Sequence, residues 1–244
     1  MKTKIALFIL FACATLAAQP VFEAASIRVN SDPDRPGSAL AQVSPGVLTM
    51  HNQALVYLIQ WAYDIPRIEI EGPPWLREVW FDVQAKAGTP ATEAEMRLML
   101  RKLLEDRFGL KFHKEPRVLP AYALTVAKGG SKLQESATEG TFSIEPRNGP
   151  VFVAHHARLT DLANGIADEA GRPIVDATGL QGRYEIRMDL TPYLRRAGEG
   201  QGPIDTESVL FTGLQEVLGL KLEPRKESVD VLVIDHVEKA PSEN

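Results

Sequence analysis

The sequence predicts an α+β protein built from two tandem copies of a βαββαββ unit, each with one small sheet and two helices. Two observations carry this prediction. The stretch "LEDRFGLKFHKEPR" at 104–117 returns as "LQEVLGLKLEPRKE" at 214–227, each time after a helical pattern and before a charged run. The match also continues upstream at a nearly constant offset, which is typical of a tandem duplication of roughly ninety residues.

The two halves align over several segments. The matching pairs are Phe108–Phe112 with Leu218–Leu222, Phe81–Val83 with Tyr184–Ile186, Leu48–Asn52 with Phe152–His156, Leu55 and Leu58 with Leu159 and Leu162, and Tyr122–Val126 with Val229–Ile234. A long repeat that occurs only twice favours two domains over a solenoid. We therefore expect a signal peptide at 1–18, a first unit with an N-terminal strand at 19–134, and a second unit at 135–244.

Each unit begins with a strand that leads into an amphipathic helix. In the first unit we expect this helix to start at Asn52, because asparagine is a favoured N-cap residue. Its buried face has the spacing of a helix and consists of Leu55, Leu58, Ile59 and Ala62.

The second helix of the first unit opens on Thr92-x-x-Glu95, which has the pattern of a capping box. An apolar stripe at helical spacing follows, formed by Met96, Met99, Leu100, Leu103, Leu104 and Phe108. The second unit repeats the stripe with Val209, Leu210, Leu214, Val217 and Leu218. Gly109 and Gly219 stand where a left-handed helix end is needed, so each repeated phrase predicts a helix end that continues into a strand.

The segments between these elements predict loops. Lys111 and Lys221 alternate with inward-facing residues, and we expect them to point to solvent. Residues 128–140 indicate a linker, and residues 195–202 ("RRAGEGQG") indicate a flexible loop. The glycines and Asp176 within 171–184 predict hairpin turns.

The N-terminus, "MKTKIALFILFACATLAA", has the form of a secretory signal: two lysines, a short apolar run and small residues. We expect cleavage after Ala18. The alternative is a lipoprotein, because Leu10–Cys13 loosely has the form of a lipobox that would place the lipid on Cys13. Cys13 is the sole cysteine, so a chain that begins at Gln19 has no disulfide, thiol catalysis or cysteine-bound zinc.

The formal charge is −5 for the whole chain and becomes −7 without Lys2 and Lys4 (25 basic against 32 acidic residues). This moderate acidity argues against a nucleic-acid or anionic-membrane surface. After the signal no apolar run approaches membrane length, so we expect no membrane span in the mature chain.

Motifs that carry chemistry are missing from the sequence. It contains no His-Glu-x-x-His, no Gly-x-Ser-x-Gly, no P-loop and no Cys-x-x-Cys. Asn30-x-Asp32-x-Asp34 has a calcium-loop spacing, but prolines interrupt it and no bidentate glutamate follows at the required place. Gly198-x-Gly200-x-Gly202 lacks the spacing of a dinucleotide site. We therefore expect no metal and no cofactor.

The histidines have two interpretations. His51 and His155 occupy equivalent repeat positions, and His156 follows directly. A shared packing or hydrogen-bonding role explains them best, because no acidic ligand spacing supports a metal site. The alternative is an exported hydrolase in which His155 or His156 works with Asp161 or Asp176.

Pro73-Pro74-Trp75 is the most distinctive loop of the first unit. Aromatic side chains beside rigid prolines can form a recognition surface, which makes Trp75 the candidate partner-binding residue. The alternative is that Trp75 covers the core of its unit.

Several stretches resemble a known family: "FEAASIRVN", "MLRKLLEDRFGLKFHKE", "YALTVAKGGSKL", "GRPIVDATGLQGRYE" and "LFTGLQEVLGLKLE". They are similar to a soil-associated family of secreted bacterial proteins that is expanded in Acidobacteria and has no established function. Some members are fused to membrane metallopeptidase sensors, which implies a sensing or binding module. By topology each unit also resembles the short N-terminal domain of secretins and TonB-dependent receptors, which implies protein–protein contacts.

These observations together favour an exported, non-enzymatic binding or interaction module of the bacterial envelope, with an envelope protein or an extracellular ligand as its partner. The hydrolase is the alternative, and a purely structural envelope component is a third interpretation.

Overall fold

The computed structural model describes residues 20–30, 41–137, 140, 142–145, 149–199 and 203–243. In the first half of the chain the elements are β1 (Phe22–Val29), β2 (Gln42–Ser44), β3 (Val47–Ala54), α1 (Leu55–Tyr63), the 3₁₀ turn η1 (Arg67–Glu69), β4 (Ile70–Glu71), the 3₁₀ turn η2 (Pro74–Arg77), β5 (Trp80–Ala87), α2 (Glu93–Phe108) and β6 (Lys111–Val126). In the second half they are β7 (Gln134–Glu135), β8 (Ser143–Ile144), β9 (Val151–Ala157), α3 (Leu159–Ala170), β10 (Ile174–Asp176), β11 (Tyr184–Asp189), α4 (Thr191–Gly198), α5 (Thr206–Gly213), the π-helical segment η3 (Leu214–Leu218) and β12 (Leu220–His236).

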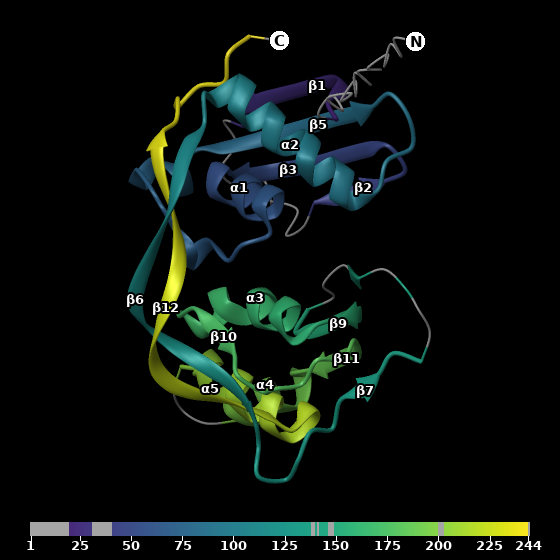
Figure 1. Cartoon of the computed structure of the whole chain (residues 1–244), viewed down its shortest axis with the longest axis vertical. Coiled ribbons are helices and arrows are strands. Elements are labelled where there is room, and N and C mark those ends of the chain that lie inside the picture. Colours follow the sequence, from purple (N-terminus) through teal and green to yellow (C-terminus); the bar gives the residue numbers. More distant parts are fainter. Residues whose placement is uncertain are drawn as a thin grey trace, which may run out of the picture.

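Two lobes are joined along one side by a long ribbon formed by β6 and β12 (Figure 1). The first lobe contains the sheet β1-β5-β3-β2, and the second contains the sheet β7-β11-β9-β8. A third sheet, β10-β6-β12-β4, is built around the ribbon. The predicted α+β class is confirmed, but the expected two sheets are three in the described part of the chain.

Each lobe has its own apolar core. Phe81 and Phe108 pack edge to face in the first core, at a ring-centroid distance of 5.2 Å. The second core gathers residues of α3, α5 and η3 against β9, β11 and the ribbon. Leu104 and Leu214 are fully buried, one in each core, as the repeat predicted.

The predicted ends of α2 are confirmed. Thr92 accepts from the backbone N–H of Glu95, and the Glu95 carboxylate accepts from the backbone N–H of Thr92, which completes the capping box. Gly109 ends α2 in the left-handed region at φ 59°, and Gly219 ends η3 at φ 67°. Glycine adopts this conformation without steric cost, so at both positions the chain turns directly from a helix into a strand of the ribbon.

The ribbon corrects the predicted βαββαββ order, because the last two expected strands of each unit are one continuous strand. Pro116 and Pro120 do not interrupt β6. The backbone N–H of Tyr122 donates to Pro173 O, on the side away from β12. Both prolines share the parity of Tyr122, so their missing N–H groups also face away from the β12 ladder.

The ribbon also connects each half of the chain to the opposite lobe. Ile70 of β4, in the first lobe, pairs in parallel with Leu232 of β12. Ile174 of β10, in the second lobe, pairs in parallel with Tyr122 of β6. Each half of the chain therefore supplies the ribbon strand that lies beside the short parallel strand of the other half.

The helix expected from Asn52 begins later. Strand β3 continues to Ala54, which is the N-cap residue of α1. Asn52 lies in a β-bulge with φ 48°, and its backbone N–H donates to Asp82 Oδ1 at 2.8 Å. Its backbone is therefore committed to the sheet rather than to the helix.

Two predicted loops are also wrong. Residues 195–198 belong to α4, a helix that starts with Pro192 in its first turn. Residues 171–184 do not form a hairpin, because β10 and β11 lie in different sheets. Asp176 and Gly179 are nonetheless turn residues: Asp176 Oδ1 accepts from the backbone N–H of Thr178, and Gly179 has φ 73°.

Some expectations fall outside the described residues. These are the signal peptide at 1–18 with Cys13, Asp32 and Asp34 of the candidate calcium loop, and Gly200 and Gly202. In the part of the chain that the structure describes, no helix is long and apolar enough to cross a membrane.

Candidate functional site: a cleft between the lobes

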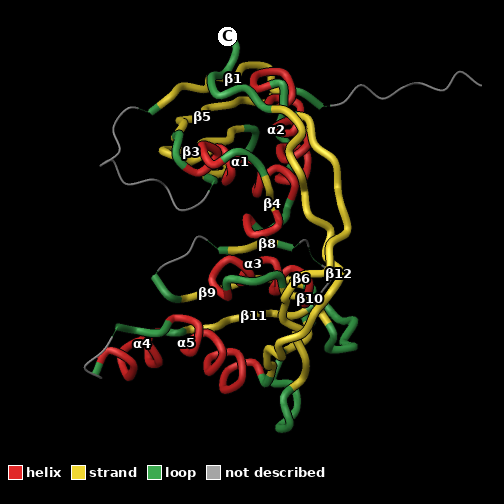
Figure 2. Tube along the Cα trace, turned by 90° about the vertical axis from the view of Figure 1, so that its left-hand side faces the viewer, coloured by secondary structure: helices red, strands yellow, loops and turns green. Residues whose placement is uncertain are grey.

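A cavity of about 270 Å³ lies between the two lobes and takes its walls from both. Figure 2 shows α3 on the side of the second lobe nearest the first, with β4 and β8 in the space between the lobes. The first-lobe wall consists of Ala41, Met50, Gln53, Tyr57, Gln60, Trp61, Asp64, Ile65, Arg67 and Arg97. The second-lobe wall consists of Phe142, Ile144, Phe152, Asp161, Asn164, Gly165, Asp168 and Glu169.

Helix α1 supplies the centre of the first wall. Leu55, Leu58 and Ile59 are buried in the core below it. Residues at i, i+3, i+4 and i+7 share one face of a helix, and the face of α1 opposite the core presents Tyr57, Gln60, Trp61 and Asp64 to the cavity. The same amphipathic pattern that buries α1 therefore orients its aromatic and polar side chains into the cleft.

Helix α3 supplies the second wall with the same spacing. Its cavity face presents Asp161, Asn164, Gly165 and Asp168, which are the positions that align with the four residues of α1. The Asp161 carboxylate has its partners within its own helix end. It is buried in the first turn and accepts from the backbone N–H of Arg158 at 2.8 Å and from the Arg158 side chain.

Asp168 is the main contact between the lobes. Its Oδ2 accepts from Arg67 Nε at 2.9 Å and from Gln60 Nε2 at 3.0 Å, and its Oδ1 accepts from the backbone N–H of Ile68 at 3.1 Å. The Asp168 side chain is 12% exposed. We call Asp168, Arg67, Gln60 and Ile68 the latch, because this group holds α3 against α1 and η1.

A second, longer hydrogen bond also crosses the cleft, and its donor comes from the second lobe. Asn164 aligns with Gln60 and Asp64 aligns with Asp168, and Asn164 Nδ2 donates to Asp64 O at 3.5 Å. Equivalent faces of α1 and α3 thus meet across the cleft. Arg67 breaks this correspondence, because the aligned position in the second lobe is Gly171.

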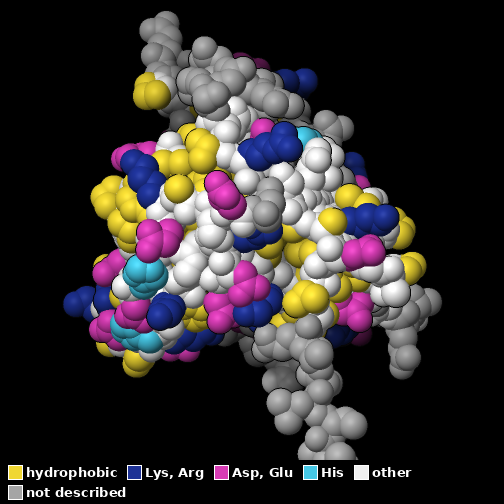
Figure 3. Space-filling view, turned by 90° about the horizontal axis from the view of Figure 1, so that it is seen from above, with side chains coloured by type: hydrophobic (Ala, Val, Ile, Leu, Met, Phe, Trp, Pro, Cys, Tyr) yellow, Lys and Arg dark blue, Asp and Glu magenta, His cyan; other side chains and the backbone are white. Residues whose placement is uncertain are grey.

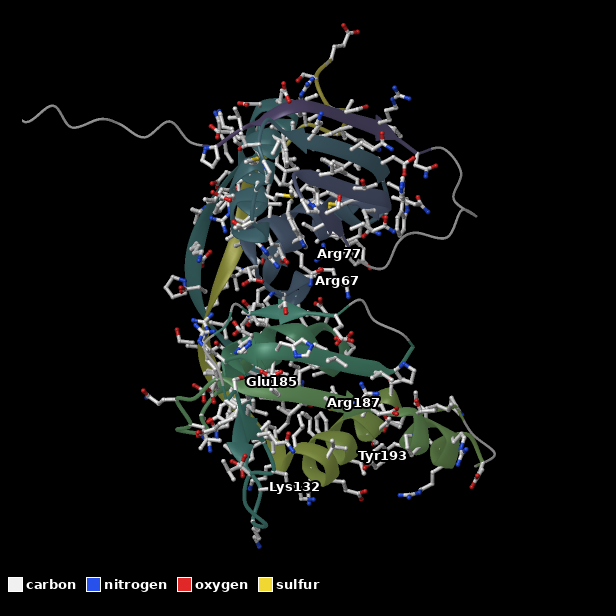
Figure 4. All side chains as sticks on the ribbon, turned by 90° about the vertical axis from the view of Figure 1, so that its right-hand side faces the viewer. Arg67, Arg77, Lys132, Glu185, Arg187 and Tyr193 are labelled. Atoms are coloured by element: carbon white, nitrogen blue, oxygen red, sulfur yellow. The ribbon has the colours of Figure 1, made fainter. Side chains whose placement is uncertain are left out.

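Two arginines lie over the aromatic rings of α1. The Arg67 guanidinium lies 4.4 Å from the centroid of the Tyr57 ring and also donates to the Tyr57 hydroxyl. The Arg97 guanidinium lies 4.9 Å from the centroid of the Trp61 ring and pairs with Asp64 at 3.1 Å. Such cation–π contacts hold the rings in fixed positions. In Figure 4 Arg67 and Arg77 lie at the end of the first lobe that faces the second.

Glu69 lies next to the latch and titrates abnormally. Burial raises the pKa of its carboxyl to about 7; the Asp168 carboxylate adds to the rise, Lys114 opposes it, and Asp230 adds to it. Protonation near neutral pH therefore changes the charge beside the contact between the lobes.

His51, His155 and His156 do not line the cleft. His51 and His155 each lie beside a carboxylate of their own lobe. His51 Nδ1 lies 3.6 Å from Asp82 Oδ1, and His155 Nδ1 lies 2.6 Å from Glu185 Oε2. His156, like Asn52, has a positive φ, and its backbone N–H donates to Glu185. Each lobe thus has a bulge whose backbone N–H donates to a carboxylate of the neighbouring strand and whose histidine lies beside that carboxylate. His155 is hydrogen-bonded to its carboxylate, whereas 3.6 Å separates His51 Nδ1 from Asp82 Oδ1, so a hydrogen-bonding role shared by His51 and His155 stays a prediction.

Hydrogen bonds shift the pKa values of both His155 and Glu185 in the second lobe. Glu185 accepts from Ser136 Oγ at 2.6 Å as well as from His155 and the backbone N–H of His156, and these contacts lower the pKa of its carboxyl to about 2. Hydrogen bonds to Glu145 and to Glu185 raise the pKa of His155. Glu185 lies on β11 (Figure 4). Across the described residues, no three His, Cys, Asp or Glu side chains are arranged to hold a metal ion.

The carboxylates named for the alternative hydrolase are not next to the histidines. Asp161 is bound by Arg158, and Asp176 accepts from the hydroxyl of Thr178. The described carboxylates beside His155 are Glu145 and Glu185. The pairing of His155 or His156 with Asp161 or Asp176 is therefore wrong, because the carboxylates of the neighbouring strands fill those places.

Trp75 lies in η2, away from the cleft lining. It is half-buried and packs against the first-lobe core, next to the fully buried Leu76. Part of the ring covers the core and part meets solvent. A partner-binding role for Trp75 stays a prediction.

The sequence did not single out the latch, and of the cleft residues it named only Asp161 as a candidate for function. A signal for them existed: the polar faces of the two first helices align position by position once Leu55 and Leu58 are matched with Leu159 and Leu162. The contact of Arg67 with Asp168 joins residues 101 positions apart, so local patterns give no indication of it.

Comparison with known families gives one result. Residues 56–237 match the model of a family described as "Protein of unknown function (DUF3738)". The chain belongs to this family. The match runs from α1 to the end of β12, so it covers the ribbon, the second lobe and the part of the first lobe that follows β3 in this DUF3738 protein, and it carries no assigned catalytic or binding residue. No curated protein and no solved structure matches the chain significantly.

Proposed function

We propose that this DUF3738 protein is an exported, non-enzymatic binding module of the bacterial envelope and that its ligand occupies the cleft between the lobes. The observation that carries the proposal is a cavity whose two walls come from one helix of each lobe, α1 and α3. Clefts between two structural units are frequent sites for ligands. The ribbon keeps the lobes together, and the latch sets how closely α1 and α3 approach.

The lining suits an organic ligand with mixed polarity. The rings of Tyr57, Trp61 and Phe152 offer flat apolar surface, and the amides of Gln60 and Asn164 offer both donors and acceptors. Such a combination is typical of pockets that bind small molecules or the side chains of a partner segment. On the face of the molecule seen in Figure 3, basic and acidic side chains are interspersed, which gives no support to a nucleic-acid partner.

We also propose that the chain is a tandem duplication whose two units, 19–134 and 135–244, have exchanged their last strands. The ladder of the ribbon supports this. If the match of Phe112 with Leu222 is continued along the ribbon without a gap, Tyr122 aligns with Leu232 and Lys114 aligns with Pro224. In the ladder Tyr122 pairs with Pro224, and Leu232 pairs with Lys114. The same exchange relates the pair Ile70 and Leu232 to the pair Ile174 and Tyr122. Each lobe therefore depends on the other half of the chain.

Export would follow from the signal sequence. The measurement is the intact mass of the chain recovered from an envelope or secreted fraction. A chain that starts at Gln19 supports cleavage after Ala18, whereas a lipid-modified start at Cys13 supports the lipoprotein alternative. Recovery of the uncleaved chain from the cytoplasm contradicts both.

The cleft is tested with a variant that fills it. Asn164 is half-buried in the cavity wall, and its one contact across the cleft is long, so Asn164→Trp places a ring in the cavity. Thr160→Trp is the matched control, because Thr160 is an exposed residue of the same helix that does not line the cavity. Each protein is incubated with an envelope extract, repurified and analysed by native mass spectrometry.

The expected result is a bound mass on the wild type and on Thr160→Trp that is missing from Asn164→Trp. Equal binding by all three proteins would contradict a ligand in the cleft. A captured compound that gains the mass of water over time on the wild type would instead support the hydrolase alternative.

A further inference from the structure

Helix α4 has no counterpart in the first lobe. Residues 88–92 connect β5 to α2 there, whereas residues 190–205 connect β11 to α5 in the second lobe and include α4. The helix is well anchored: Asp189 Oδ1 accepts from the backbone N–H of Thr191 at 2.9 Å. Leu190, the N-cap residue of α4, packs its Cδ2 methyl against Gly213 of α5. The fold of the lobe does not require this helix, so another reason for it is needed.

The helix forms one wall of a second cavity, of about 270 Å³, which lies within the second lobe. We call this cavity the chamber. The side chains that make it apolar are Ile166, Met188, Leu190, Leu194, Val209 and Leu210, from α3, β11, α4 and α5. Apolar cavities of ~150 Å³ already bind benzene, so the chamber, at about 270 Å³, has room for a larger aromatic group or an aliphatic chain.

The chamber has few polar side chains. Glu169 of α3 and Thr206 of α5 line it, and among the described residues of its wall none is basic. A carboxylate at the edge of an apolar cavity accepts from a hydroxyl or an ammonium group and repels an anion. The occupant that fits this wall is apolar with a neutral or cationic donor at one end.

The chamber adjoins the cleft. Phe152 and Glu169 line both cavities. A Cβ at Gly165 would lie 3.2 Å from the Phe152 ring, so the ring lies close against the backbone of α3. Phe152 therefore separates the two cavities, and Glu169 stands at the edge of each.

We infer that the chamber is a binding site for a small amphiphile, an aliphatic or aromatic group that carries an alcohol or an ammonium head, with the apolar part between α4 and α5 and the head at Glu169. This site is separate from the ligand proposed for the cleft, and its test does not depend on that ligand.

The test uses the fluorescent probe N-phenyl-1-naphthylamine, which is apolar, uncharged and carries one N–H donor. The full chain should bind the probe with a rise in fluorescence. Leu194→Trp fills the chamber from α4, where Leu194 is half-buried, and should weaken probe binding by at least about tenfold. Leu98→Trp is the control: Leu98 is 45% exposed on α2 of the first lobe, and this variant should bind like the wild type.

Competition then tests the head group. Octylamine and octanol should displace the probe at concentrations at least about tenfold lower than octanoate, because Glu169 repels the carboxylate. Glu169→Gln should remove most of this difference. Thr206→Trp fills the chamber from α5, where Thr206 is exposed, and serves if Leu194→Trp does not fold.

Two results would overturn the inference. Unchanged probe binding in a folded chamber-filling variant would place the probe elsewhere. Displacement by octanoate as effective as that by octylamine would remove the role of Glu169.

Discussion

The latch offers the sharpest test of how the lobes are held together. Asp168 accepts three hydrogen bonds across the cleft, one of them from the charged Arg67. Hydrogen bonds to charged groups contribute about 1.5–3 kcal/mol and neutral ones about 0.5–1.5 kcal/mol. Arg67 is 32% exposed, so solvent screens part of its share. We expect Asp168→Ala to lower the free energy of unfolding by about 2–4 kcal/mol.

The assay is urea denaturation followed by tryptophan fluorescence, because Trp61 lies in the cleft beside the latch. A double-mutant cycle with Arg67→Ala isolates the pair and should give a coupling energy of about 1–3 kcal/mol. The control is Asp235→Ala. The pair of His113 with Asp235 has a similar distance of 2.8 Å, but both side chains are about half exposed, so its loss should cost less than about 1 kcal/mol.

A coupling energy below about 0.5 kcal/mol would refute this reasoning, because that is the scatter expected of independent sites. The contact would then be incidental, and the ribbon would have to hold the lobes together without it.

Three further outcomes follow from burial and charge. Leu104→Ala and Leu214→Ala should each cost about 2–5 kcal/mol in thermal or urea unfolding, because both leucines are fully buried; a near-neutral result at both would contradict the equivalence of the two cores. Burial raises the pKa of the Glu69 carboxyl from its ordinary 4.5 to about 7 in the folded protein, so its contribution to stability is present below pH 4.5 and is lost as pH rises through 7. Glu69→Gln should therefore be more stable than the wild type at pH 8 and nearly equal to it at pH 4. The difference in the free energy of unfolding at pH 8 should be at most about 3 kcal/mol, and solvent screening makes it smaller. An unchanged pH profile in the variant would exclude Glu69 as the cause of this pH dependence. Trp75→Ala should weaken partner capture in a pull-down from envelope extract with little change in the folding transition, whereas a large loss of stability with unchanged capture would assign Trp75 to the core.

The sequence predicted best where local chemistry decides the structure. The capping box at Thr92 and the left-handed helix ends at Gly109 and Gly219 depend on a few neighbouring residues, and all three are confirmed. The stripe that contains Leu104 and Leu214 was also correct, because apolar spacing alone identifies a buried helix face.

The predictions that were wrong depend on distant partners. Asn52 is a good N-cap residue by type, but the Asp82 carboxylate, supplied by another strand, holds its backbone in a bulge. Two strands were expected where β6 is one; its prolines lie at positions whose N–H would face away from β12, so the ladder continues past them. The pairings of Ile70 with Leu232 and of Ile174 with Tyr122 have no local signal, because each joins a short strand to a ribbon strand from the other half of the chain.

The candidate site was invisible to motif searches for the same reason. Its walls combine residues of two helices that are far apart in the chain, and each residue type is ordinary on a helix surface. The only signal for the wall residues in the sequence is the spacing that the outward faces of α1 and α3 share.

Whether a ligand binds between the lobes is tested by hydrogen–deuterium exchange of the full chain with and without the compound captured from envelope extract. A ligand in the cleft should protect Leu55–Tyr63 and Leu159–Ala170, the helices of the two cleft walls, at the same time. Protection of one helix alone, or protection confined to Pro74–Arg77 around Trp75, would contradict a ligand that is held by both lobes.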